Sequence, residues 1–341
     1  MAKPVIKQKP PGSCQSPLDE KRVTVGAYGS IELRVRQMTA CPACCSRAIR
    51  PISATARGFF EEPPDTGVWQ PPYRIMRCDD CNLHFKSDAV PYEDLVGYYE
   101  RLDFTPFELG YRFPTDAALL RALNQLPEGA SILDFGCSTG RMLARLGNRY
   151  RRFGTEMNGD AAAVARRRGI AIIAEEELLK SHVGYFDAII LSDVFEHLFK
   201  PLQTLVELTR CLKPKGILAI VAGITDAIDL PGHEGEYWYF RLPGHLQMMS
   251  LKHAQWLSLR LGMREITISE RISHYSPPFP VRVKTAVQKV IYAIARRRST
   301  NSVCAVLVQL PLLRRSVAWE YPPGEAYRKD HVIVLMRKSD C

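Results

Sequence analysis

From residue 131 onwards, short runs of apolar residues, many of them β-branched, alternate with segments in which apolar residues recur every three or four positions. The short runs predict strands, and the segments between them predict helices. Regular alternation of this kind is typical of an α/β domain built on a mostly parallel sheet. The predicted strands are residues 131–135, 152–156, 170–173, 186–192 and 216–223, and the predicted helices are residues 140–147, 160–168 and 201–212.

Beyond residue 250 the pattern predicts a helix and two further strands, with a long stretch between the strands. The helix covers residues 250–263, and the strands cover 265–273 and 330–338. The stretch at about 277–328 is therefore an insertion in a domain that we expect to span 131–341. An apolar stripe at helical spacing lies within the insertion; it consists of Val283, Val287, Val290, Ile291 and Ile294.

The N-terminal part lacks this alternation. Residues 1–35 begin with a polar, proline-containing stretch without periodicity, which predicts a flexible tail. Residues 91–130 contain two helical patterns, at 90–104 and 115–126, and the second has Thr115 as a candidate N-cap. We expect these helices to link residues 36–90 to the α/β domain.

The ten cysteines of the chain give residues 36–90 a candidate chemistry. Cys41-Pro-Ala-Cys44 and Cys78-Asp-Asp-Cys81 are two knuckles of identical spacing, each able to place two thiolates on one tetrahedral zinc ion. Four protein ligands close the coordination sphere, so such a zinc is structural. The prediction is a zinc-binding ribbon over 36–90.

The turn after the first strand of the α/β domain points to a ligand. Asp134 ends that strand, and Gly136 and Gly140 flank the turn that leads into the next helix. Glycines let the backbone turn tightly beside a ligand, and the helix N-terminus presents free N–H groups. A turn of this kind occurs both in dinucleotide-binding proteins and in nucleoside-binding transferases.

Four segments, taken in chain order, resemble the class I S-adenosylmethionine-dependent methyltransferases. Residues 132–140 resemble motif I of that family, with Ser138 at the position of its middle glycine, and the second predicted strand ends in an acid, Glu156. FDAIILSDVFEHLFKP at 186–201 resembles the pattern F-D-x-I-x-x-x-x-V-x-E-H-x-x-x-P, and CLKPKGILAIV at 211–221 resembles an L-K-P-G-G turn, with Lys215 replacing a glycine. The resemblance implies a Rossmann-like, doubly wound methyltransferase sheet, mostly parallel with an antiparallel last strand, and S-adenosyl-L-methionine as cofactor.

The resemblance also implies the residues that bind the cofactor. Glu156 stands where the family places an acid that accepts hydrogen bonds from both ribose hydroxyls. Asp193 is expected at the mouth of the cofactor or acceptor pocket, and Cys137 is expected to contribute its backbone N–H. The predicted cofactor-binding set is Asp134, Gly136, Cys137, Gly140, Glu156, Met157 and Asp193.

The N-terminal knuckles, Phe85 and a Tyr-Tyr pair before the core are similar to a subgroup with a zinc ribbon, many of whose members act on sugars, polysaccharide precursors or secondary metabolites. Sugar C-methyltransferases of this subgroup carry a Tyr-His-Glu-His cluster, of which Leu242-Pro243-Gly244-His245 keeps only the last His. Because imidazole has a suitable pKa for removing a proton near neutral pH, His245 and His197 are the candidate catalytic residues. Glu196 is expected to orient His197 or to cap the next helix.

The charge of the chain is concentrated. Residues 281–315 hold eight Lys and Arg residues and no Asp or Glu, whereas the formal net charge of the chain is +10. Three interpretations stay open for this segment: a solvated basic helix face, a helix at an anionic membrane surface (281–313), or a clamp for phosphate groups. The N-terminus has Pro and Lys where a signal peptide needs an apolar core, so we expect a cytoplasmic protein, with peripheral membrane contact under the second interpretation.

These observations predict a methyltransferase that acts on a small molecule or a sugar or glycan precursor, at oxygen. An RNA methyltransferase that uses the ribbon and the basic insertion to bind nucleic acid is the alternative, although residues 36–90 lack a dense basic cluster interleaved with aromatics. A non-catalytic protein that binds the cofactor is a further alternative.

Overall fold

The computed structural model describes residues 18–25, 31–56, 71–101, 113–228, 231–263, 265–269, 271–272, 279–280, 283–284, 286–287 and 329–339. Most of the predicted insertion at 277–328, and with it most of the apolar stripe and the basic segment, lies outside these residues. His274 also lies outside them.

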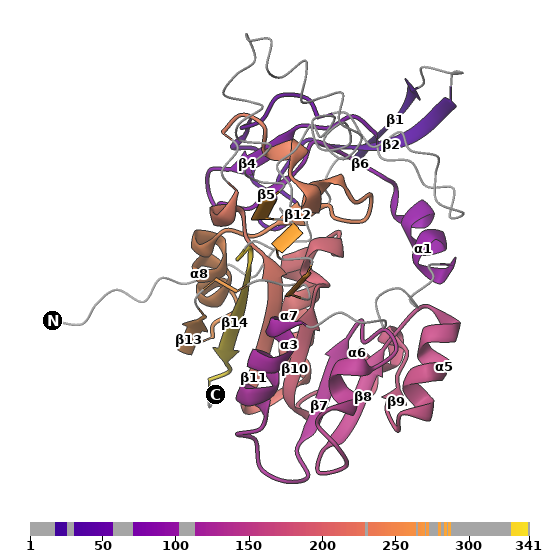
Figure 1. Cartoon of the computed structure of the whole chain (residues 1–341), viewed down its shortest axis with the longest axis vertical. Helices are drawn as coiled ribbons and strands as arrows, with labels where there is room; N and C mark the ends of the chain where they lie inside the picture. Colours follow the sequence, from indigo (N-terminus) through magenta and orange to yellow (C-terminus); the bar gives the residue numbers. More distant parts are fainter. Residues whose placement is uncertain are drawn as a thin grey trace, which may run out of the picture.

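A sheet of seven strands forms the centre of the described fold, in the order β13-β14-β11-β10-β7-β8-β9. Strands β7 to β11 run parallel, and β14 pairs antiparallel with both β11 and β13. This arrangement confirms the predicted doubly wound, mostly parallel sheet with an antiparallel last strand (Figure 1). The strands are β7 (Ser131–Phe135), β8 (Arg151–Thr155), β9 (Ala171–Ile172), β10 (Phe186–Ser192), β11 (Leu212–Gly223), β13 (Glu265–Ile268) and β14 (His331–Arg337).

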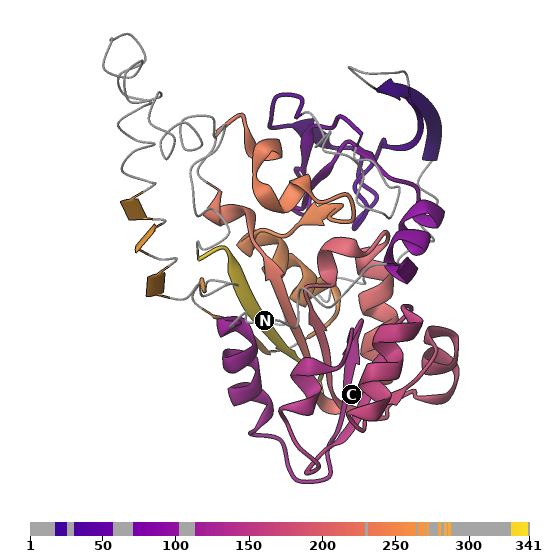
Figure 2. The same cartoon turned by 45° about the vertical axis from the view of Figure 1, so that its right-hand side comes forward.

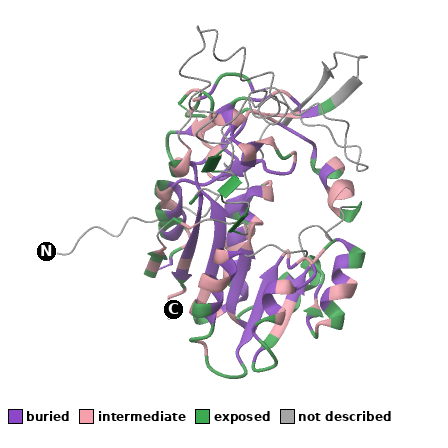
Figure 3. Ribbon diagram, viewed as in Figure 1, coloured by how far each residue is buried: buried purple, intermediate pink, exposed green. Residues whose placement is uncertain are grey.

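Helices cover both faces of this sheet, and the alternation of strand side chains explains why. Successive residues of a strand point to opposite faces; Ala188 and Ile190 of β10 belong to one buried cluster, Ile189 and Leu191 to the other. The central strands are accordingly buried over most of their length (Figure 3). The first cluster packs against α3 (Pro114–Leu123), α4 (Arg141–Ala144) and α5 (Gly159–Arg167), and the second against α6 (Glu175–Ser181), α7 (Pro201–Cys211) and α8 (Leu251–Arg260).

Two local expectations differ from the structure. The prediction of Thr115 as an N-cap is wrong: α3 begins at Pro114 with Phe113 at its N-cap, because proline is preorganised for the first helical position. Helix α4 ends at Ala144, earlier than expected, and Gly147 with φ +70° lies three residues beyond. Helix α6 has no counterpart in the predicted elements.

The N-terminal half contributes two smaller sheets and a helix. Strands β1 (Leu18–Val25) and β2 (Ile31–Met38) pair antiparallel within the stretch expected to be a tail, and β6 (Asp88–Ala89) adds to β2. Helix α1 (Tyr92–Arg101) follows. The second sheet has the order β12-β5-β4-β3 and is formed by β3 (Ile49–Pro51), β4 (Ile75–Cys78), β5 (His84–Lys86) and β12 (Gln247–Met248).

Strand β12 comes from the segment that follows β11, so the second sheet joins chain regions about 160 residues apart. Met248 pairs with His84, and Gln247 with Phe85. Figure 2 shows the orange segment after β11 beside the purple N-terminal strands. The segment between β11 and β12 also contains the short 3-10 helices η2 (Thr225–Ala227), η3 (Glu234–Glu236) and η4 (Trp238–Arg241).

Candidate functional site

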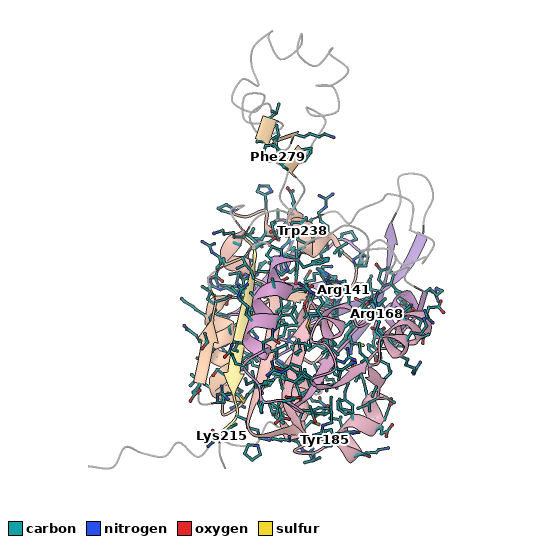
Figure 4. All side chains as sticks on the ribbon, turned by 60° about the horizontal axis from the view of Figure 1, so that its bottom comes forward. Arg141, Arg168, Tyr185, Lys215, Trp238 and Phe279 are labelled. Carbon is teal, nitrogen blue, oxygen red and sulfur yellow. The ribbon has the colours of Figure 1, made fainter. Side chains whose placement is uncertain are left out.

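A cavity of about 750 Å³ opens at the carboxyl edge of the parallel strands. In open α/β sheets this edge is where ligands bind, since loops leaving adjacent strands diverge there. Its walls come from the turns after β7, β8 and β10, from α1, from η4 and from the start of β14. Arg141 and Trp238, which line the cavity, lie toward one end of the molecule in Figure 4, and Tyr185 and Lys215 lie at the other.

The glycine turn forms one wall of the cavity. Gly136 and Gly140 adopt φ values of +76° and +72°, and Ser138 between them adopts +50°. A Cβ atom at Gly140 would lie 2.0 Å from Ile170 Cδ1. The turn therefore also needs glycine because it packs closely against Ile170. The Cys137 N–H donates to Thr155 O over 2.9 Å, which ties the turn to β8.

Two carboxylates on this wall can accept hydrogen bonds from a ligand. Glu156, the first residue after β8, accepts the Ser138 N–H on Oε2 and the Asn158 N–H on Oε1, both over 2.8 Å. Each of its oxygens keeps a second lone pair. Asp134 is 3% exposed, and within the described part of the chain its buried Oδ1 has no hydrogen-bond partner. Burial raises the pKa of Asp134 well above its usual value and raises that of Glu156.

These features fit the predicted cofactor. An unpartnered buried carboxylate oxygen, a glycine turn at a helix N-terminus and an acid at the next strand end match the amine, nucleoside and ribose groups of S-adenosylmethionine. Six of the seven predicted cofactor residues line this cavity: Asp134, Gly136, Cys137, Glu156, Met157 and Asp193. Gly140 does not line it; it is the N-cap of α4.

Histidines and acids form the opposite wall. The rings of His197 and His245, the two candidate catalytic residues, lie with centroids 4.8 Å apart. Tyr99 Oη and Gly244 O lie 2.6 Å and 2.9 Å from His197 Nδ1. Burial lowers the pKa of His197 to about 4, although Gly244 O opposes the shift. Burial and the neighbouring His197 lower the pKa of His245 well below its usual value, so both rings are neutral at pH 7.

Glu196 does not cap a helix; that prediction is wrong. It lies in the 3-10 helix η1 (Phe195–His197), is 1% exposed and accepts the Tyr239 hydroxyl on Oε1 over 2.5 Å. Burial and the nearby Asp193 raise its pKa to about 8. Two buried atoms of this wall, Glu196 Oε2 and His245 Nδ1, have no hydrogen-bond partner among the described residues.

Three titratable residues of the cavity were not among the predicted catalytic or cofactor-binding residues. Tyr99, Tyr239 and His331 reach it from α1, η4 and β14. His331 has no motif around it in the sequence. Its one signal is Asp330-His331 at the start of a strand that the fold must bury, where charged residues need partners.

Among the residues that the structure describes, two groups of side chains have the composition of metal sites. The four predicted zinc ligands, Cys41, Cys44, Cys78 and Cys81, lie within 4.8 Å of one another. Their sulfurs lie 3.4 Å apart in the pair Cys41 and Cys81 and 3.5 Å apart in the pair Cys44 and Cys78. Four bonds of about 2.3 Å in a tetrahedron place sulfurs about 3.8 Å apart, so the cluster fits zinc. The second group is Glu196, His197 and His245.

Comparison with known proteins bears on the same part of the chain. A family model described as a methyltransferase domain matches residues 111–266. A ubiquinone biosynthesis O-methyltransferase of Caulobacter vibrioides is 30% identical over 153 residues, which cover 40% of this chain and 59% of that protein. Residues 111–266 are therefore similar to a methyltransferase domain, and the chain spans less than two thirds of the length of the curated relative that it matches.

Solved structures with a similar fold include two methyltransferases and a cyclase. A possible histamine N-methyltransferase of Thermotoga maritima has a TM-score of 0.42 and 16% identity, over 66% of this chain and 89% of that one. An S-adenosylmethionine-dependent methyltransferase of Archaeoglobus fulgidus has a TM-score of 0.42 and 16% identity, over 73% and 100%. The [4+2]-cyclase SpnF has a TM-score of 0.44 and 19% identity, over 70% and 84%.

Proposed function

We propose that the chain is an S-adenosylmethionine-dependent methyltransferase that methylates an oxygen of a small molecule or of a sugar or glycan precursor. The observation that carries the proposal is one cavity with two chemically different walls. The glycine turn with Asp134 and Glu156 forms one wall, and two neutral histidines with tyrosines form the other. The similarity to an O-methyltransferase supports the choice of oxygen.

When bound, the cofactor supplies an electrophilic methyl group on a sulfonium. The protein then has to hold the acceptor hydroxyl in line with that methyl group and receive its proton. Asp134, Glu156 and the turn at Gly136 would hold the cofactor. The aromatic side chains of Tyr99 and Tyr239 would pack against the acceptor.

His245 is the proposed proton acceptor. Its Nδ1 is buried without a hydrogen-bond partner in the described structure, and its ring is neutral, so the lone pair is available to an acceptor hydroxyl. His197, held at Nδ1 by Tyr99 and Gly244, would orient the acceptor. His245 would receive the proton of the acceptor hydroxyl when that oxygen is methylated.

The direct test uses S-adenosylmethionine carrying a labelled methyl group, fractionated cell extract and identification of the labelled product. We expect one low-molecular-weight labelled product with the label on oxygen, and a rate at least ~100-fold lower for His245→Ala at unchanged cofactor affinity. Labelled RNA would assign the alternative function. Cofactor binding without any labelled product would indicate a non-catalytic protein. Activity that depends on added divalent cations would assign Glu196, His197 and His245 to a metal site instead.

The cysteine cluster is the proposed structural zinc site. Its four sulfurs offer a closed tetrahedral ligand set, and three of the four cysteines are buried. Metal analysis of undenatured protein should give one zinc per chain, and Cys78→Ser should reduce it to well below one. Full zinc content in that variant would contradict the assignment.

The basic segment is the proposed contact with an anionic membrane surface, which would place a cytoplasmic enzyme near a lipid-linked acceptor. Phe279, Val283 and Val287, at helical spacing, are 75%, 48% and 54% exposed. Phe279 stands clear of the body of the molecule (Figure 4). An apolar face beside basic residues is typical of interfacial helices. None of the described helices is long and apolar enough to cross a membrane.

A further inference from the structure

Asp193 lies between the two walls of the cavity. It follows β10 directly and lines the cavity. Its charge contributes to the raised pKa of Asp134 on the cofactor side and of Glu196 on the histidine side. A carboxylate in this place adjoins the region where a methyl group has to pass from one wall to the other.

The backbone at Asp193 is strained. Its φ is +55°, in the left-handed region that is unfavourable for a residue with a Cβ atom. Such strain persists where several contacts together hold the backbone in that conformation. At Asp193 the Val221 carbonyl accepts its N–H over 3.0 Å, and the Ser192 hydroxyl donates to Oδ2 over 3.3 Å.

His331, the first residue of β14, contacts the side chain of Asp193. Its Nε2 lies 3.3 Å from Asp193 Oδ1, and its Nδ1 lies 2.7 Å from Asp330 Oδ1. His331 is 1% exposed, and Asp330 is fully buried. Burial alone would lower the pKa of His331, but the hydrogen bonds to the two carboxylates raise it to about 10. The ring is therefore an imidazolium at neutral pH.

Asp330 in turn is fixed by two donors from the segment that covers the cavity. Its Oδ2 accepts the Tyr237 hydroxyl over 2.6 Å and the Trp238 indole N–H over 3.2 Å. Both donors belong to the stretch that also carries Tyr239 and, further on, His245. The orientation of Asp193 is thus set by a chain of contacts that begins outside the cofactor wall.

We propose that the His331–Asp330 pair is a positioning device that holds the Asp193 carboxylate at the cavity, where its negative charge selects the sulfonium form of the cofactor over the neutral thioether product. The inference rests on the proposed function. The two forms differ in one methyl group and one positive charge, both at sulfur. A fixed carboxylate in a partly desolvated cavity acts on that charge difference, because Coulomb interactions strengthen as water is excluded.

The test is titration calorimetry with S-adenosylmethionine and with S-adenosylhomocysteine. In the wild-type protein we expect tighter binding of the sulfonium form. Asp193→Asn should reduce the ratio of the two dissociation constants about ten-fold, mainly by weakening S-adenosylmethionine. His331→Asn should reduce the ratio in the same direction by a smaller factor, because the carboxylate remains but is no longer held. The control Asp226→Asn, at a residue that does not line the cavity, should leave it unchanged.

A measurement on the wild-type protein does not depend on how the variants fold. A cofactor analogue with a protonated amine in place of the sulfonium should bind nearer to S-adenosylmethionine than to the thioether. Equal weakening of both ligands in Asp193→Asn, an unchanged ratio in His331→Asn, or an amine analogue that binds like the thioether would each overturn the inference. If neither S-adenosylmethionine nor its product binds the wild-type protein, the proposed function fails as well.

Discussion

At the scale of single residues, the two departures from the family's glycine pattern keep a glycine-like backbone. Ser138 and Lys215, which replace glycines of motif I and of the turn before β11, have φ values of +50° and +63°. The turn geometry is thus retained while the residue that favours it is absent. For residues with a Cβ atom this conformation is higher in energy than it is for glycine.

Lys215→Gly is therefore expected to stabilise the protein, by about 1 kcal/mol. The carbonyl of residue 215, which accepts the Arg337 guanidinium over 3.1 Å, is kept in the variant. Thermal unfolding should show a midpoint about 2 °C higher. Lys215→Ala is the matched control, because it removes the same charge but keeps the Cβ atom. An equal gain in both variants would show that charge, and not backbone strain, is responsible.

His331 makes stability depend on pH. Its pKa is raised from an ordinary value of 6.5 to about 10, so its ion pairs stabilise the fold fully below pH 6.5, and this contribution is lost as the pH rises through 10. Urea unfolding of wild type and His331→Asn between pH 6 and pH 9.5 should show a difference in unfolding free energy that is largest at pH 6, up to about 5 kcal/mol, and falls with rising pH. A difference that grows with pH would contradict the imidazolium.

At the scale of elements, the cysteine cluster is linked to the histidine wall through β5. The Lys86 N–H donates to Leu246 O and the Leu246 N–H to Glu196 O, each over 2.9 Å. Lys86 Nζ donates to Leu242 O over 2.8 Å. On the other side, His253 Nδ1 in α8 lies 2.9 Å from Cys81 O. The backbone on both sides of His245 is thus held by the strand that follows the second knuckle.

Loss of the proposed zinc should therefore increase hydrogen exchange near the cavity. In hydrogen exchange, removing zinc with a chelator or by Cys78→Ser should speed exchange in peptides covering 84–86 and 245–250, by ten-fold or more on an order-of-magnitude estimate. A peptide from α5 should not change. Cys211→Ser, at a buried cysteine outside the cluster, is the control and should not affect 245–250 selectively. Unchanged exchange at 245–250 without zinc would exclude the link.

Elements with strong periodicity were predictable, and those fixed by distant contacts were not. Strands β7 and β10 have their predicted bounds, because each is a buried apolar run with a turn signal after it. Strand β12 has two residues, and pairing with β5 alone defines it. The same holds for the candidate site. The candidate cofactor residues follow a motif along the chain and could be predicted. The contact between His331 and Asp193 could not, because it depends on the order of the strands in the sheet.

At the scale of the whole molecule, charge is unevenly distributed along the chain. Residues 281–315 carry eight basic residues and no acids, which leaves the rest with a formal charge of +2. Flotation with vesicles that contain anionic lipid should carry the full-length protein upward, and 0.5 M salt should weaken the effect. A chain lacking 281–313 should stay at the bottom. Equal flotation of both chains, or flotation with neutral vesicles alone, would contradict the membrane contact.

The position of β14 has a consequence for how the protein matures during synthesis. This strand inserts between β11 and β13, and its first residue, His331, completes the contacts of Asp193. While a ribosome is still adding those residues, the cysteine knuckles and the parallel strands are already available to fold, but the cavity lacks His331. The nascent chain can therefore gain most of its core before His331 reaches Asp193, so the contacts of Asp193 form late in folding.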